Sequence, residues 1–177
     1  MQRHQILIID GYNVIRNNNR YAGLGLDYES GRGWNKAREA LINDAAHFAQ
    51  DSYERCVVVF DGGGNPESSG QPAIEAGIEV IFSPTGVSAD AVIERLAHDA
   101  REQGLEAVVV SSDFAIQSTV YGGGVTRMSA AAFASDSETL EQDWKRNSKT
   151  TPHPKNTVAD RIAPDVLAKL NAIVEGK

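Results

Sequence analysis

The sequence predicts an α/β fold: a three-layer α/β/α sandwich in which helices cover both faces of a central, mostly parallel sheet. Short, continuous apolar runs, the pattern of strands buried on both faces, lie at residues 6–9, 56–60 and 107–110. Stretches with apolar residues at every third or fourth position, typical of amphipathic helices, alternate with these runs. Such alternation indicates parallel strands joined by helical crossovers.

The first half of the chain is expected to hold two buried strands and one long helix. The four aliphatic residues at 6–9 are too few for a buried helix and fit a central strand. The stretch 16–33 is polar and glycine-rich, so we predict a long surface connection there. A helix is expected over 34–50 because its apolar side chains form one stripe, and the strand over 56–60 leads into a glycine-rich loop over 62–70.

The second half is expected to continue the alternation and to end in a basic tail. Ser88 is a good N-cap for the helix after the third strand. Residues 145–160 include two prolines and few apolar side chains, which predicts an extended linker, and Pro164 and Gly176 bound a final amphipathic helix. The predicted elements are strands over 77–82, 107–110 and 125–128, helices over 88–103, 114–121 and 164–175, and a helical or broken-helical segment over 129–144.

Length and composition are those of an ordinary globular protein. At 177 residues, 41% hydrophobic and 23% charged, the chain is long enough for a substantial core. We predict a main domain over 1–144, with the basic linker and helix of 145–177 packed on it. No apolar run approaches the roughly 20 residues of a membrane span and no signal-peptide pattern is present, so we expect a cytoplasmic protein. Cys56, the single cysteine, is expected to be a buried thiol.

The net charge of −7 conceals three regions of different sign. Residues 1–38 hold six Lys/Arg and three Asp/Glu (+3), residues 39–144 hold four and eighteen (−14), and residues 145–161 hold five and one (+4). This pattern suits an acidic site flanked by basic contact surfaces. Solvated faces sorted by chance would give the same pattern, and both interpretations stay open.

Carboxylates recur at equivalent positions after the predicted strands. Asp10, Asp61 and Asp113 follow buried strands, and Asp90 opens the helix after another. In an open α/β sheet, ligands bind beyond the carboxyl ends of the strands, so parallel strands would bring these acids to one edge. Acids so close repel unless a cation neutralises them, and carboxylate oxygens suit Mg²⁺ or Mn²⁺. Metal-assisted attack of water on a phosphodiester is the chemistry that follows.

Three further side chains are expected to surround this site. They are Glu94, Ser112 and Arg38. A role as ligand of a second metal stays open for Glu94 or Asp61. Glu94 lies one helical turn after Asp90, so the two carboxylates share one side of the helix. A simpler interpretation exists for individual acids, since Asp90 favours the helix dipole and Asp113 alone would serve as an N-cap.

The predicted connection over 16–33 supplies candidates for contacts with single-stranded RNA. Arginine side chains bind phosphates, and tyrosine rings stack on unpaired bases. A mobile surface connection without a ligand is an equally good interpretation. The candidates are Arg16, Arg20, Tyr21 and Arg32.

Together these motifs resemble a known family. Asp-Gly-Tyr-Asn at 10–13, Val-Phe-Asp at 59–61, Ala-Asp-x-x-Ile-Glu at 89–94 and Ser-Ser-Asp at 111–113 resemble the YacP-like branch of the NYN domains, which are PIN-like nucleases. The resemblance covers roughly residues 6–135 and leaves the tail from 145 outside.

This resemblance implies a PIN-like, Rossmann-like topology and a divalent-metal-dependent endoribonuclease. The catalytic residues that it implies are Asp10, Asn13, Asp61, Asp90 and Asp113, of which Asp10, Asp90 and Asp113 would bind Mg²⁺ or Mn²⁺. A member of the branch associates with ribosomes and cuts messenger RNA there, which makes messenger RNA the implied substrate and the ribosome the implied partner. The segment 62–67 is less basic than the family pattern.

Other classes of function make different demands on the sequence. A phosphatase that forms an aspartyl-phosphate would use Asp10 as nucleophile, but Tyr12 occupies the position where its second Asp is expected. A non-enzymatic adaptor would bind RNA, a ribosome or a protein through the basic tail, and the complete set of acids disfavours a decayed site. A receiver-type signalling domain would need adjacent acids after the first strand, where this chain has Asp10 alone.

Overall fold

The computed structural model describes residues 4–25, 32–63, 68–112 and 125–150. The chain separates into two compact units, Met1–Glu141 and Gln142–Lys177, and the fold below is that of the first. The packing of 145–177 on the main domain therefore stays a prediction. The predicted helices over 114–121 and 164–175 lie outside the described residues.

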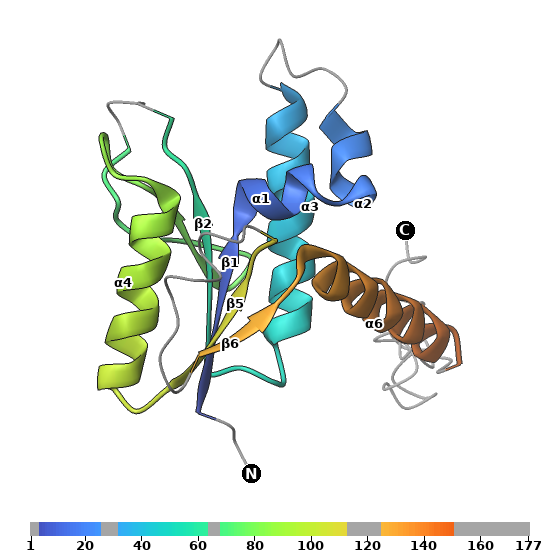
Figure 1. Ribbon diagram of the computed structural model, residues 1–177. Helices are drawn as coiled ribbons and strands as arrows, with labels where there is room; N and C mark the ends of the chain where they lie inside the picture. The colour runs from blue at the N-terminus through green and yellow to red at the C-terminus, as the bar shows by residue number, and fades with distance from the viewer. Residues whose placement is uncertain (1–3, 26–31, 64–67, 113–124, 151–177) are drawn as a thin grey trace, which may run out of the picture. The chain divides into compact units, whose positions relative to one another are not determined.

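A six-stranded sheet forms the centre of the first unit, with helices on both faces (Figure 1). The strand order is β3-β4-β2-β1-β5-β6; β3 and β4 pair antiparallel, and the other neighbours pair parallel. The predicted α/β sandwich with a mostly parallel sheet is confirmed. The strands are β1 (Gln5–Asp10), β2 (Arg55–Phe60), β3 (Ala73–Glu75), β4 (Ile78–Phe82), β5 (Glu106–Val110) and β6 (Val125–Met128). The helices are α1 (Gly11–Arg16), α2 (Asn19–Ala22), the 3₁₀ turn η1 (Gly23–Gly25), α3 (Arg32–Ala49), α4 (Ala89–Glu102) and α6 (Ala130–Thr150).

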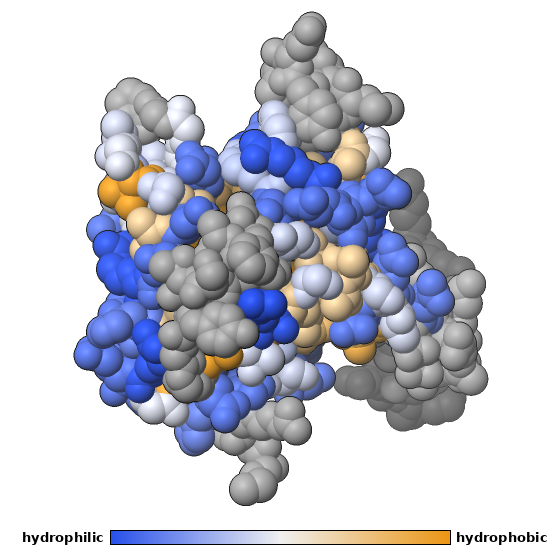
Figure 2. Space-filling model, viewed as in Figure 1, coloured by the Kyte–Doolittle hydropathy of each residue, from blue (hydrophilic) through white to orange (hydrophobic). Residues whose placement is uncertain are grey.

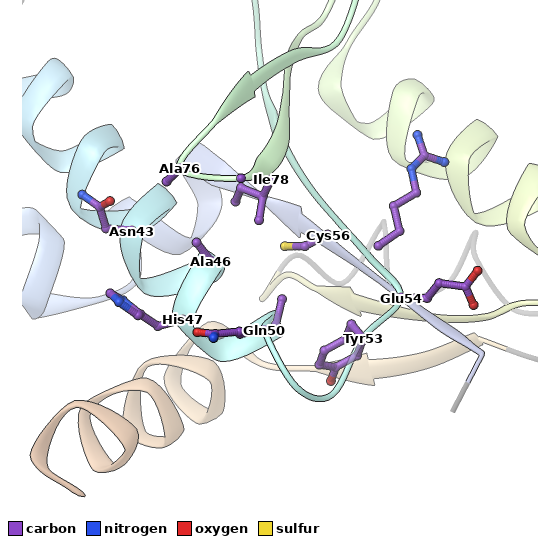
Figure 3. Close-up of a pocket in the computed structure, with 12 residues that line it drawn as sticks. Asn43, Ala46, His47, Gln50, Tyr53, Glu54, Cys56, Ala76 and Ile78 are labelled. Atoms are coloured by element: carbon purple, nitrogen blue, oxygen red, sulfur yellow. The ribbon is translucent and has the colours of Figure 1, made fainter. Parts of the chain in front are cut away.

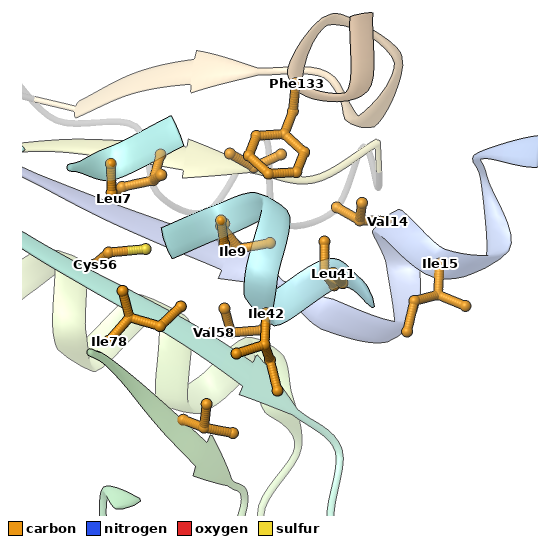
Figure 4. Close-up of a cluster of buried hydrophobic side chains, with 14 of the residues drawn as sticks. Leu7, Ile9, Val14, Ile15, Leu41, Ile42, Cys56, Val58, Ile78 and Phe133 are labelled. Carbon is orange, nitrogen blue, oxygen red and sulfur yellow. The ribbon is translucent and has the colours of Figure 1, made fainter. Parts of the chain in front are cut away.

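The central strand β1 is buried on both faces, which explains its unbroken apolar sequence. Leu7 and Ile9 pack in the cluster that includes Leu41 of α3 (Figure 4). Ile6 and Ile8 pack on the opposite face, in the cluster that includes the apolar side of α4. Because successive side chains of a strand point to opposite faces, a strand between two helical layers needs an apolar residue at every position.

Four parts of the backbone differ from the sequence-based prediction, and the first of them is helix α1 over Gly11–Arg16, which was not predicted. Residues 19–25 form α2 and η1, so the prediction of a surface connection there is wrong; Asn18 caps α2, its Oδ1 accepting the Arg20 N–H at 2.8 Å. Helix α6 continues to Thr150, so the prediction of an extended linker is wrong for its first residues. Strand β3 was not predicted, and its three residues are all exposed.

The described surface is predominantly hydrophilic in the view of Figure 2. No helix within the described ranges is long and apolar enough to cross a membrane. Cys56 is a buried free thiol, as predicted, and burial raises its pKa to about 12.

Candidate active site at the carboxyl edge of the sheet

Asp10 ends the central strand and at the same time caps helix α1. Its Oδ1 accepts the backbone N–H of Asn13 at 3.3 Å, and its Oδ2 accepts the Ser111 hydroxyl at 3.3 Å. Each carboxylate oxygen thus has its own donor, and the residue is only 7% exposed. The structure therefore holds a carboxylate in a fixed orientation at the end of the middle strand, where α/β sheets bind ligands.

Gly11 lets α1 begin directly against the sheet. A Cβ at this position would lie 2.3 Å from Cε1 of Phe60, the last residue of β2. Any larger residue would have to displace the Phe60 ring, so the Asp-Gly pair of the sequence is a steric requirement of this turn.

Asn13 ties the first turn of α1 to the end of β5. Its Oδ1 accepts the backbone N–H of Ser112 at 2.8 Å. The Ser112 hydroxyl in turn accepts the backbone N–H of Ala130, the first residue of α6, at 3.2 Å. Ser111 and Ser112 thus connect Asp10 and Asn13 to the far side of the sheet, and neither contact with these serines was predicted from the sequence.

Asp61 follows β2, the neighbour of β1, and its side chain is exposed. Val59 is the register partner of Asp10, which places Asp61 two residues further along the adjacent strand. Its Oδ1 accepts the Gly63 N–H at 2.8 Å, which orders the start of the following loop. The residue lies at the predicted edge, but its carboxylate is already used in a local turn.

Helix α4 brings two more acids to the carboxyl end of β4. Ser88 is the N-cap as predicted, its Oγ accepting the Ala91 N–H at 3.2 Å. Asp90 lies in the first turn and Glu94 one turn later, and both are half-buried. Both side chains lie near the amino terminus of α4, where the partial positive charge of the helix dipole attracts a carboxylate.

The donor chemistry of this edge fits a hard divalent cation. The buried, oriented carboxylate of Asp10 and the half-buried carboxylate of Asp90 offer the oxygen ligands that Mg²⁺ and Mn²⁺ prefer. Asp113, the third predicted ligand, lies outside the described residues. Within the described ranges, no three His, Cys, Asp or Glu side chains form a group that could hold a metal, so Asp61 and Glu94 do not complete such a group with Asp10 and Asp90.

Arg38 reaches this edge from α3. Its Nη1 donates to the Tyr12 hydroxyl at 2.7 Å, and its Nη2 donates to Asn35 Oδ1. Tyr12 lies two residues after Asp10, so Arg38 supports the turn that carries the catalytic candidate. The sequence left open whether Arg38 faces the site or water, and its role beside the site stays a prediction.

Two of the predicted RNA contacts have structural roles instead. The Tyr21 side chain is fully buried and donates its hydroxyl to Asp44 Oδ2 at 2.8 Å, so the prediction that it stacks on a base is wrong. Burial and the Asp44 carboxylate raise the pKa of the Tyr21 phenol. Arg20 donates to both oxygens of Asp44, from Nε at 2.7 Å and from Nη2 at 3.0 Å. The side chain of Arg32 lies outside the described residues.

A pocket of about 480 Å³ lies at the opposite, amino edge of the sheet (Figure 3). The last turn of α3 contributes His47, Gln50 follows that helix, and the first residues of β2 and β4 contribute Cys56 and Ile78. Of the predicted site residues that the structure describes, none lines this pocket.

Comparison with known proteins identifies the family. The model of the YacP-like NYN domain matches residues 7–175. The chain belongs to the YacP-like NYN domain family. The match continues through the basic tail, which the motif-based resemblance had left outside the family region.

Relatives of this YacP-like NYN protein have been found in Bacillus subtilis. The uncharacterized protein YacP of strain 168 is 29% identical over 164 residues, which cover 92% of each chain. The crystal structure of Rae1 (YacP) shows a chain that is 27% identical with a TM-score of 0.69, and the match covers 97% of this chain and 95% of that one. The crystal structure of a point mutant of Rae1 (YacP) is 26% identical with a TM-score of 0.65 and covers 96% and 99%. The PIN-like α/β class is thereby confirmed, and membership indicates a nuclease at the level of the family.

Proposed function

We propose that this protein is a divalent-metal-dependent endoribonuclease that hydrolyses phosphodiester bonds of single-stranded RNA. One observation carries the proposal: the Asp10 carboxylate is fixed at the carboxyl end of the central strand by the Asn13 N–H and the Ser111 hydroxyl. Membership of a nuclease family supports it. The resemblance to the YacP-like branch further supports messenger RNA as the substrate, the ribosome as a partner and the cytoplasm as the location.

The side chains of the edge have distinct roles in this proposal. Asp10 and Asp90, with Asp113, would hold Mg²⁺ or Mn²⁺, which when bound lowers the pKa of a coordinated water and neutralises charge on the phosphate. Asn13 keeps Asp10 oriented, because its backbone N–H contacts that carboxylate while its side chain is anchored to Ser112. An oriented ligand needs no rearrangement when the reaction begins, which is the advantage of a preorganised site.

The substitution Asp10→Asn tests the proposal. The amide keeps the size of the side chain and an oxygen for the Asn13 N–H, but it removes the negative charge that would bind the cation. Losing several kcal/mol of transition-state stabilisation lowers the cleavage rate on the order of 10³-fold. The rate is measured on a labelled single-stranded oligoribonucleotide with Mg²⁺ or Mn²⁺ and again with a chelator, after circular dichroism has confirmed folding. Undiminished cleavage by the variant, or wild-type cleavage in the chelator, would contradict the proposal.

A further inference from the structure

Four arginines of the described residues are held in two different ways. Arg20 and Arg55 each bind both oxygens of a carboxylate: Arg20 that of Asp44, and Arg55 that of Glu79 at 2.6 and 2.7 Å. These bonds raise the pKa of Arg55. Paired in this manner, the two guanidinium charges are compensated within the protein, and an incoming anion would have to compete with a bidentate partner.

Arg16 is held by aromatic rings instead of a carboxylate. Its guanidinium carbon lies 5.8 Å from the centre of the Tyr12 ring and 5.7 Å from that of Trp34. The two rings contact each other edge-on at 5.0 Å, so they form one platform. Arg16 is exposed, and no described carboxylate forms an ion pair with it.

Arg38 is held in the same way over the neighbouring strands. Its guanidinium carbon lies 6.0 Å from the ring centre of Phe60 and 5.4 Å from that of Phe82. Its hydrogen bonds to Tyr12 and Asn35 both go to neutral oxygens. Within the described ranges Arg38 therefore has no carboxylate partner either, and its full positive charge remains uncompensated.

Ring-held arginines are well suited to bind phosphate. A ring restricts the side chain through cation–π attraction without cancelling its charge, so part of the entropy cost of ordering it is already met. The guanidinium group keeps donors for a phosphate, and its outer face can stack on a base. An arginine paired with a carboxylate has neither advantage.

The two side chains stand next to the proposed catalytic edge. Phe60 and Phe82 are the last residues of the neighbouring strands β2 and β4, and their rings stack at 5.3 Å. Tyr12 also contacts Phe60, at 5.1 Å between ring centres. The rings of Trp34, Tyr12, Phe60 and Phe82 thus form a continuous aromatic row, which begins on α1 and α3 and passes the turn after Asp10.

We propose that Arg16 and Arg38, supported by this aromatic row, bind the backbone phosphates of the single-stranded RNA beside the phosphodiester that is cut at Asp10. The substrate should be single-stranded, because only unpaired bases can stack on aromatic rings or on a guanidinium plane. Tyr12 and Trp34 are half-buried, and the guanidinium group of Arg16 beside them is exposed. This inference rests on the proposed nuclease function and adds the surface that selects its substrate.

Direct binding in the Asp10→Asn background tests the inference without cleavage. Fluorescence anisotropy with a labelled single-stranded oligoribonucleotide measures Kd for Arg16→Ala and Arg38→Ala at several salt concentrations. Each loss of a phosphate contact is expected to raise Kd about tenfold and to reduce the slope of log Kd against log salt by about 0.7. Arg101→Ala is the matched control, because it removes the same charge at the last turn of α4, away from the aromatic row.

Two further variants separate phosphate binding from general charge. Trp34→Leu is expected to weaken binding through the loss of the platform for Arg16 while leaving the salt slope unchanged. Arg38→Lys is expected to keep the salt slope and to lose part of the affinity, because lysine lacks the planar group. Equal Kd values for Arg16→Ala, Arg38→Ala and Arg101→Ala would overturn the inference and leave the nuclease proposal intact. Retained cleavage by Asp10→Asn would overturn the nuclease proposal, and the binding measurements would still decide on the arginines.

Discussion

The amino and carboxyl edges of the sheet differ in shape and in how their arginines are paired. The amino edge contains the pocket of about 480 Å³, and its nearby arginine, Arg55, is neutralised by Glu79. At the carboxyl edge, hydrogen bonds orient the Asp10 carboxylate. Beside it, the guanidinium groups of Arg16 and Arg38 contact aromatic rings and not carboxylates of the described residues. The proposed active site therefore lies where the parallel strands end and where arginines lack a carboxylate partner among the described residues. The pocket at the amino edge has neither feature.

The largest difference between the edges is expected in catalysis. Asp90→Asn should lower cleavage of a single-stranded oligoribonucleotide by at least about a hundredfold, because it would remove one of the charged oxygen ligands that we propose for the metal. His47→Ala, in the pocket at the amino edge, should leave the rate within about twofold of wild type. The comparison breaks down if His47→Ala is the more damaging of the two substitutions while both variants remain folded.

A second difference concerns stability. Asp44→Asn removes the negative charge and one of the two oxygens that accept from Arg20 and the Tyr21 hydroxyl, and the Asp44 side chain is only 14% exposed. We expect the free energy of unfolding in urea to fall by about 1–3 kcal/mol. Arg16→Ala should change it by less than about 1 kcal/mol, since the Arg16 side chain is exposed. A greater loss for Arg16→Ala would show that the ring-held arginine is a structural element.

The smallest effect is expected from Cys56, at the amino edge. The pKa of the Cys56 thiol is about 12 in the folded chain and about 8.5 in the unfolded chain. Above about pH 8.5, the unfolded chain therefore loses a thiol proton that the folded chain retains. This thiol stabilises the fold fully below about pH 8.5, and its contribution falls as the pH rises towards about 12. Urea unfolding at pH 8 and pH 10 should show a smaller decline for Cys56→Ala than for wild type. Equal declines would contradict the assigned shift, and cleavage at pH 8 should be unaffected.

The strands and long helices could be predicted because their signals are local. Apart from Asp10 at the end of β1, the buried positions of β1, β2 and β5 are all apolar, and the helix predicted over 34–50 is α3. Helix α2 was missed because its stability depends on a distant residue: Tyr21 is buried against Asp44, which the polar composition of this stretch conceals. In the sequence, the position of Asp44 next to the apolar stripe of α3 was the feature that could have indicated its contact with Tyr21.

The short strand β3 was missed for a different reason. Its turn to β4 uses Ala76 and Gly77 with φ values of 49° and 85°, where Asn-Gly or Asp-Gly would be the usual sequence signal. The helical segment was predicted to end near residue 144 because residues 145–160 include two prolines and few apolar side chains, yet the first of these prolines lies only at position 152. Helix α6 continues to Thr150, shortly before Pro152.

The candidate site was predictable in its residues but not in its connections. Asp10 and Asn13 follow the first strand, and the topology of a parallel sheet places them at its carboxyl edge. Their contacts with Ser111 and Ser112 depend on β5 lying next to β1, and the support of Arg16 and Arg38 depends on how α1 and α3 cross. Contacts of this kind arise from packing between elements and leave no local pattern.

The bond between Asp10 and Ser111 spans 101 positions of the chain. During synthesis, Asp10 therefore emerges long before the serine that orients it, and Ala130, the residue that anchors Ser112, emerges later still. Contacts so distant in sequence form late, because the loop between them must first be closed. A product of interrupted translation that ends before β5 therefore lacks the Ser111 hydroxyl that orients the Asp10 carboxylate.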